Sequence, residues 1–261
     1  MKIFILILLF LFGCSKPQKV QIIKSDGNSY NFAEVSLPNL KDLFSLQGNN
    51  FSFYANQTYF SYEFNEKIKS FDSFNEMLNI LQKDLASQPI KLDLQAYNNV
   101  YKPNSFESLI LVSAYYAFED IRQKAQQYLK ISSKAFNHLN IGFYPSLFVS
   151  KSSFSAYLTE DNAIYMPNLD SVFLLAPGKL RGLPLNMNVG AYAHEYFHRI
   201  FHKEVWESIN WQAFKKDIKQ ENYSDSELRS KKLLSSTDEG LADLFAVAYS
   251  ANPDFLFLSL T

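Results

Sequence analysis

The feature that most constrains this chain is a pair of histidines one helical turn apart inside an apolar segment. Residues 190–201 read GAYAHEYFHRIF, so His194 and His198 are four positions apart and Glu195 lies between them. Side chains four apart share one face of a helix. The surrounding residues are apolar nearly all round, which predicts a buried helix. Buried imidazoles and a buried carboxylate are costly unless something satisfies them, and a metal ion would do so.

Zinc is the ion that this pattern predicts, with one ion per chain. Two imidazoles on one helical face can each reach a zinc ion at ~2.0–2.1 Å. Glu195 follows His194 by about 100° round the helix, so it lies beside the ion without binding it. There it can take a proton from a water held by the metal. We therefore predict His194 and His198 as ligands and Glu195 as the catalytic base.

A second apolar helix is predicted over residues 236–249, read as STDEGLADLFAVAY, with Glu239 and Asp243 on one face. With the His-Glu-x-x-His motif, this segment resembles the gluzincins, the thermolysin-like zinc metallopeptidases. The resemblance covers about residues 143–250. It implies that Glu239 is the third zinc ligand. It also implies that Asp243 accepts a hydrogen bond from the His194 ring, which would fix the ring's tautomer.

Other interpretations of single residues stay open. Glu239 is also placed to form a capping box with Ser236 as the N-cap. His202 lies ~6 Å beyond His198 along a straight helix, so we assign it to structure or to the rim of a cleft. Gluzincins commonly use a Tyr or His to stabilise the oxyanion, and the candidates for that role are Tyr192, Tyr223 and Tyr249.

The N-terminus reads MKIFILILLFLFGC. Its apolar run, Ile3 to Phe12, would form a helix of only ~15 Å, half the thickness of the bilayer core, which predicts a signal peptide over residues 1–13. The end of the run resembles the lipobox of bacterial lipoproteins, which implies cleavage before Cys14 and acylation of Cys14. Ser15 follows Cys14, at the position where an Asp would signal retention in the inner membrane. We expect a lipid-anchored protein of the cell envelope, on the outer membrane in a cell with two membranes, with residues 14–31 as a polar tether.

Composition sets the fold class and excludes one class of partner. The net charge of −1 leaves no excess of cations for phosphates, so we expect no nucleic-acid partner. Aromatic residues make up 16% of the chain, which predicts an aromatic-rich core. We expect an α+β fold with a mostly helical N-terminal region over residues 32–140. A peptidase-like domain over residues 141–261 would then contain a small sheet, the motif helix and the second ligand helix.

The pattern of apolar and turn-forming residues also predicts where individual strands and helices lie. Asp161-Asn162 suggests a hairpin turn. One of two segments, 163–167 or 171–176, is expected to be the edge strand that pairs with an extended peptide, as the resemblance implies. We expect strands within 51–64, 143–150, 154–159, 163–167 and 171–176, and helices over 71–86, over 106–139 and from Asn188 onward.

These observations favour a membrane-anchored zinc-dependent peptidase that hydrolyses peptide bonds of a peptide or protein substrate outside the cytoplasm. The alternative is a non-catalytic envelope lipoprotein whose zinc site is structural or vestigial and which binds a partner. Structural zinc sites are usually closed by four protein ligands, often cysteines. Cys14 is the only cysteine of this chain.

Overall fold

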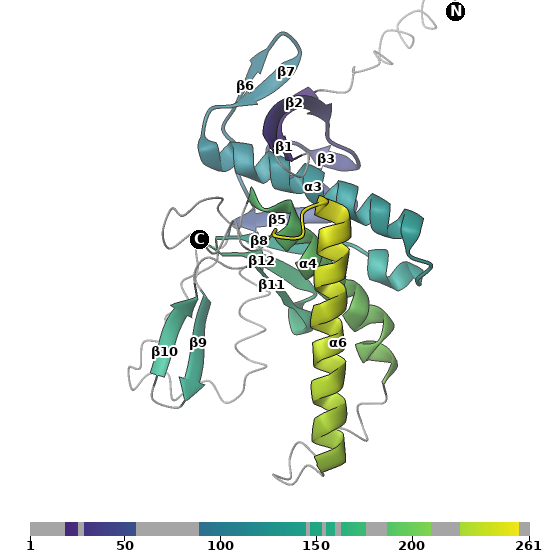
Figure 1. The fold of residues 1–261 in the computed structure, drawn as a ribbon. Coiled ribbons are helices and arrows are strands. Elements are labelled where there is room, and N and C mark those ends of the chain that lie inside the picture. The colour runs from purple at the N-terminus through teal and green to yellow at the C-terminus, as the bar shows by residue number, and fades with distance from the viewer. Residues whose placement is uncertain are drawn as a thin grey trace, which may run out of the picture.

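The computed structural model describes residues 19–25, 29–55, 89–144, 147–152, 155–159, 163–175, 187–209 and 225–255, and it shows a mixed α+β fold (Figure 1). The strands are β1 (Lys19–Ser25), β2 (Tyr30–Ser36), β3 (Leu40–Asp42), β4 (Gln47–Gly48), β5 (Phe51–Ala55), β6 (Leu94–Tyr97), β7 (Val100–Pro103), β8 (Leu139–Phe143), β9 (Leu147–Ser152), β10 (Ser155–Thr159), β11 (Ala163–Met166) and β12 (Ser171–Leu174). The α-helices are α3 (Phe106–Tyr128), α4 (Val189–Glu204) and α6 (Asp225–Ser250), and short 3₁₀ turns are η2 (Ser133–Phe136), η3 (Pro167–Leu169) and η5 (Trp206–Ser208).

A six-stranded sheet forms the centre of the molecule. Its strands follow the order β11-β12-β8-β5-β4-β3. Strands β12, β8 and β5 are parallel, and β11 joins the sheet antiparallel to β12. Strand β11 therefore lies at one edge of the sheet, and β12 lies inside it. Smaller sheets are formed by β2-β1-β7-β6 and by β10-β9.

The core is aromatic, as the composition predicts. Rings from β5, α3 and α4 meet between the central sheet and the two helices. Phe118 of α3 stacks on Tyr192 of α4 with ring centroids 5.1 Å apart, and Phe51 of β5 lies 5.6 Å from Phe118 and 6.2 Å from Tyr196. These rings are almost completely buried. They fix α4, the motif helix, against the sheet by the burial of large apolar surfaces.

Asn188 starts helix α4, at the residue where the sequence predicts it. Its side-chain oxygen accepts hydrogen bonds from the backbone N–H groups of Gly190 and Ala191, at 3.0 and 3.2 Å. Such an N-cap satisfies donors that the helix itself leaves unpaired. The amide nitrogen of Asn188 also donates to the carbonyl oxygen of Phe255, at 2.5 Å. One side chain thus joins the start of α4 to the segment that follows α6.

An ion pair between buried Arg199 and half-buried Asp170 attaches α4 to the turn between β11 and β12. The Arg199 side chain is completely buried, and its Nε and Nη2 atoms donate to the two oxygens of Asp170, at 2.8 and 3.0 Å. Burial acts to raise the pKa of Asp170, but the hydrogen bonds and charge of Arg199 outweigh it, so this pKa is lowered. The pair therefore favours the folded state while Asp170 is ionised.

The N-terminal part corrects the sequence prediction. We expected residues 32–140 to be mostly helical, but the described residues before α3 form strands β2 to β7. Part of this difference is the β6–β7 hairpin, which turns at Asn98 and Asn99. These two residues adopt positive φ angles of 46° and 66°. Asparagine tolerates this left-handed conformation, and two such residues make a tight hairpin turn. Helix α3 itself falls inside the predicted helical range 106–139.

Two further expectations differ from the structure. Part of the expected tether, 14–31, is strand β1, because Val20 and Ile22 alternate with polar residues and are buried at 1% and 0% exposure. The turn expected at Asp161-Asn162 lies outside the described residues, and the described strands on either side of it pair elsewhere, β10 with β9 and β11 with β12. The predicted helix over 71–86 and residues 1–18 lie outside the described residues. Within the described part of the chain, no helix is long and apolar enough to cross a bilayer.

Two glycines give a matched test of this packing. A Cβ atom added at Gly190 would lie 2.6 Å from the Phe255 ring, whereas one added at Gly240 in α6 would meet nothing within 4 Å. Alanine is favoured over glycine in a helix by about 1 kcal/mol. We expect Gly240→Ala to raise the free energy of unfolding and Gly190→Ala to lower it, measured by urea denaturation. Equal effects at both positions would contradict the close packing of Phe255 on α4.

The Asp170–Arg199 pair makes stability depend on pH. Because the pKa of Asp170 is lower in the folded state, its contribution is complete above the unfolded pKa, about 3.9, and is lost as pH falls through the folded pKa. The difference in unfolding free energy between the natural chain and Asp170→Asn should be largest near neutral pH and shrink in acid. A difference that stays constant down to the acid transition would show that the ionised carboxylate is not the stabilising group.

Candidate metal centre

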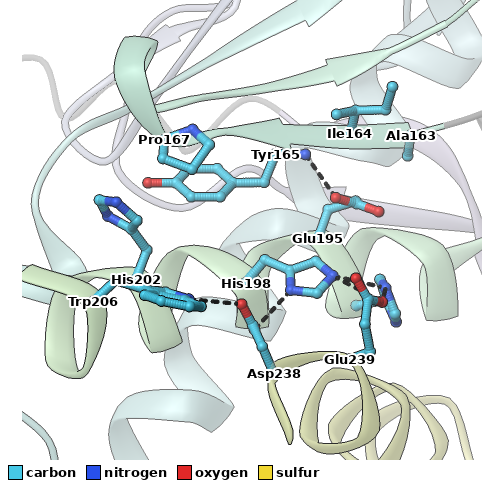
Figure 2. Close-up of a pocket in the computed structure, with 11 residues that line it drawn as sticks. Ala163, Ile164, Tyr165, Pro167, Glu195, His198, His202, Trp206, Asp238 and Glu239 are labelled. Carbon is cyan, nitrogen blue, oxygen red and sulfur yellow. Dashed lines mark hydrogen bonds and ion pairs between the residues drawn. The ribbon is translucent and has the colours of Figure 1, made fainter. Parts of the chain in front are cut away.

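His194 and His198 of helix α4 both line a cleft, and Figure 2 shows His198 beside Glu195 and Glu239 there. The two histidine side chains are 13% and 15% exposed. The two Nε2 atoms lie 2.9 Å apart, and the rings meet edge to face with centroids 4.5 Å apart. His194, Glu195 and His198 offer ligand atoms within 4.8 Å of one another, a cluster that can hold a metal ion.

Helix α6 brings a carboxylate to the same point. It packs along α4 through contacts that include the rings of Phe197 and Phe245, whose centroids are 5.3 Å apart. Oε2 of Glu239 lies 3.5 Å from Nε2 of His194 and 3.5 Å from Nε2 of His198. A tetrahedral ion with bonds of ~2.0–2.1 Å holds its ligand atoms about 3.3 Å apart. The three atoms are therefore spaced as the ligands of one small cation would be.

A second pair of carboxylates holds the far sides of the two rings. Asp238 Oδ1 is hydrogen-bonded to Nδ1 of His198 at 2.8 Å, whereas Asp243 Oδ1 lies 2.9 Å from Nδ1 of His194 in an ion-pair contact without hydrogen-bond alignment. Each carboxylate favours the tautomer whose proton is on Nδ1. In neutral rings, both Nε2 atoms then carry lone pairs that face each other and the Glu239 carboxylate. This arrangement is repulsive unless a positive charge lies between them, either a metal ion or a proton that one Nε2 shares with the other at 2.9 Å.

The two imidazoles respond differently to their surroundings. Burial lowers the pKa of His194, and the neighbouring His198 lowers it further, which favours the neutral ring. Burial acts to lower the pKa of His198 too, but the hydrogen bond to Asp238 and the charge of Glu195 outweigh it and this pKa is raised. The His198 ring therefore binds positive charge more strongly than the His194 ring.

Glu195 faces the cleft from the same helix. It is 9% exposed, and its Oε2 accepts a hydrogen bond from the backbone N–H of Tyr165 in β11, at 2.6 Å. Burial raises the pKa of Glu195 to about 7. A carboxyl group with such a pKa can both accept and release a proton near neutral pH.

The cleft has a volume of about 670 Å³ and lies between α4, α6 and the edge strand β11. Strand β11, the edge strand of the central sheet, contributes one wall of the cleft, and its Tyr165 N–H points to Glu195 (Figure 2). The lining residues are Ala163, Ile164, Tyr165, Pro167, His194, Glu195, His198, His202, Trp206, Asp238 and Glu239.

The structure decides between the interpretations left open for Glu239 and His202. Helix α6 begins at Asp225, so Ser236 lies inside the helix and the capping-box interpretation of Glu239 is wrong. His202 lines the cleft beyond His198, with its ring centroid 6.1 Å from that of Tyr165, in agreement with the predicted place at the rim.

The tyrosines considered as oxyanion stabilisers lie elsewhere or are not described. Tyr192 is stacked in the core, 2% exposed, and the Tyr249 hydroxyl donates to Asp120 at 2.8 Å. Tyr223 lies outside the described residues. Tyr165 and Trp206, by contrast, do line the cleft.

Sequence analysis missed Asp238 and the tryptophan that holds it. Trp206 Nε1 donates to Asp238 Oδ2 at 3.1 Å, while the other oxygen contacts His198. The pairing runs in opposite order along the two helices: the first histidine meets the later acid, and the second meets the earlier one. The sequence did show a second acid, Asp238, about one turn before Asp243. Assigning it to His198 required knowledge that α6 packs antiparallel to α4.

The chain matches no protein-family model and no curated protein. Any functional assignment must therefore be argued from the site itself.

The second carboxylate gives a prediction for metal affinity. Outer carboxylates that orient ligating histidines typically contribute 10- to 100-fold, so we expect Asp238→Asn to weaken zinc binding by about that factor. Glu239→Ala should weaken it at least as much, because it removes an oxygen 3.5 Å from both rings. Asp254→Asn, at an exposed position outside the cleft, is the control. Zinc titration against a competing chelator measures each affinity, and unchanged binding in Glu239→Ala would exclude it from the ligand set.

Proposed function

We propose that this chain is a zinc-dependent peptidase of the gluzincin type, anchored to a membrane and acting outside the cytoplasm. The observation that supports this best is the meeting of two imidazole nitrogens and the Glu239 oxygen, with Glu195 beside them in an open cleft. A second helix that brings a carboxylate and a further acid to the motif histidines is the arrangement the resemblance implies.

The donor set favours zinc. Two imidazole nitrogens and one carboxylate oxygen form a common catalytic zinc set, which leaves one position for water or substrate. His194, His198 and Glu239 would hold one ion per chain, and Asp243 and Asp238 would orient the two rings. When bound, zinc supplies Lewis acidity: it polarises the carbonyl group of a peptide substrate and makes water more acidic.

Glu195 performs the proton transfers in this proposal. Its carboxylate lies in the cleft, one residue after His194 on the same helix. It accepts a proton from the attacking water and then passes that proton to the amine that leaves as the peptide bond breaks. Both transfers need a carboxyl group held close to the reacting atoms, and the hydrogen bond from Tyr165 N–H restrains it there.

Strand β11 is the proposed binding site for the substrate backbone. Of the two segments considered from sequence, 163–167 contains the strand at the sheet edge, whereas 171–176 contains β12, which is paired on both sides. An extended peptide can add to an exposed edge by main-chain hydrogen bonds. Strand β11 lines the cleft beside Glu195, so a peptide laid along it would pass the proposed zinc ligands.

The location rests on the N-terminal sequence. Cys14 at the end of a short apolar run resembles a lipobox, so we propose that acyl chains on Cys14 hold the protein on the envelope membrane. Each buried CH₂ contributes ~0.8 kcal/mol, and more than one chain is needed for stable anchoring. Ser15 favours the outer membrane where two are present.

The alternative, a non-catalytic lipoprotein with a structural zinc site, makes a different prediction for the space around the ion. Structural zinc sites are closed by four protein ligands. Here the candidate ligands line a cleft of about 670 Å³ together with Glu195. This open access favours the peptidase.

Glu195→Gln separates the two functions. Glutamine keeps the size of the side chain but cannot take the proton, so hydrolysis should fall by about 10²–10⁴-fold while zinc still binds at one ion per chain. The matched control is Glu204→Gln, near the end of the same helix and outside the cleft lining. Cleavage of a broad peptide library by the zinc-loaded full chain is the measurement.

Two outcomes would contradict the proposal. Unchanged hydrolysis in Glu195→Gln would remove the assigned base. Zinc at one ion per chain with no cleavage by the natural chain would favour the structural alternative.

A further inference from the structure

Arg199 is the largest fully buried side chain of the described residues, and it directly follows His198. A buried cation is costly unless its donors are satisfied. Besides the two bonds to Asp170, Nη1 donates to the carbonyl oxygen of Ala135 at 2.8 Å, and Nη2 donates to that of His138 at 3.1 Å. The guanidinium thus joins α4 to two segments of the sheet side of the molecule: the η2–β8 connection and the β11–β12 turn.

Asp170 also connects Arg199 to the edge strand β11. It has a φ of 43° at the end of η3, a left-handed conformation that turns the chain from β11 toward β12. Its Oδ1 also accepts a hydrogen bond from the Tyr165 hydroxyl, at 3.0 Å. One carboxylate therefore receives donors from both α4 and β11.

The backbone of Tyr165 makes a second link between β11 and α4. Its N–H donates to Glu195, and Glu195 and Arg199 are four residues apart on α4. Side chains at this spacing lie on one face of a helix. Helix α4 therefore reaches Tyr165 directly through Glu195 and indirectly through Arg199 and Asp170, and the His202 ring of the same helix lies 6.1 Å from the Tyr165 ring. These contacts along one face fix both the separation and the relative angle of α4 and β11.

We infer that Arg199 is a positioning residue: through Asp170 and Tyr165 it holds the edge strand at a fixed distance from α4, and so holds Glu195 in place. This inference rests on the proposed function, because the gap between α4 and β11 is the space in which a peptide would be cleaved. Arg199 touches neither Glu195 nor the cleft lining among the described contacts, so its effect passes through the Asp170–Tyr165 connection.

The test uses three variants of the full chain. Arg199→Lys keeps the charge but cannot make the paired bonds to Asp170. Tyr165→Phe removes only the hydroxyl that binds Asp170. Tyr249→Phe is the matched control, because it removes another partly buried hydroxyl–carboxylate bond, to Asp120, away from the cleft. Thermal unfolding of each variant first establishes that it is folded.

The first readout does not depend on catalysis. In the metal-free chain, we expect the amide of residue 165 to exchange its hydrogen about tenfold faster or more in Arg199→Lys and Tyr165→Phe, and at the natural rate in Tyr249→Phe. The second readout is peptide hydrolysis by the zinc-loaded chain. Misplacement of Glu195 by a fraction of an ångström should lower kcat by about tenfold or more, with little change in KM.

The outcomes are distinguishable. If residue 165 exchanges at the natural rate in both variants, or if kcat per folded molecule is unchanged, Arg199 serves stability alone and the inference is wrong. If the natural chain cleaves no peptide, the proposed function fails, and the exchange measurement still decides whether Arg199 positions Glu195.

Discussion

The site depends on an electrostatic constraint between two packed helices. Helices α4 and α6 bring two imidazole nitrogens to 2.9 Å from each other and a carboxylate oxygen to 3.5 Å from both. The acids on the opposite side of each ring favour the tautomer that directs lone pairs inward. Groups of this kind repel one another in the absence of a positive charge, so the fold places together atoms that a shared proton or a metal ion can satisfy.

The rest of the structure holds these helices in place. The aromatic core packs Phe118 and Phe51 against the buried face of α4 and so fixes its rotation about its own axis. Asn188 sets the residue at which α4 begins and joins it to Phe255, which follows α6. Arg199 ties the same helix to the edge strand. A shift of one residue in α4 would turn His194 and His198 away from α6, so these contacts determine the site as well as the fold.

The sequence predicts what depends on local spacing, and it fails where the outcome depends on distant partners. His194, Glu195 and His198 follow from helical periodicity, and the start of α4 follows from Asn188. Asp238 could not be assigned, because only the antiparallel packing of α6 on α4 shows which acid meets which ring. Arg199 was equally hidden, since its partner Asp170 is 29 residues away on a turn. Short strands such as β6 and β7 have too few residues to show a clear alternation of apolar and polar side chains. They were therefore included in a region that we expected to be mostly helical.

The central claim is that three side chains from two helices share one zinc ion. Crystals of the full chain loaded with one equivalent of zinc, measured at the zinc absorption edge, test it directly, because the anomalous signal locates the ion without reference to the protein. The account predicts a single strong peak ~2.0–2.1 Å from Nε2 of His194, Nε2 of His198 and a carboxylate oxygen of Glu239. A peak elsewhere on the chain, or one that Glu239 does not approach, would contradict it.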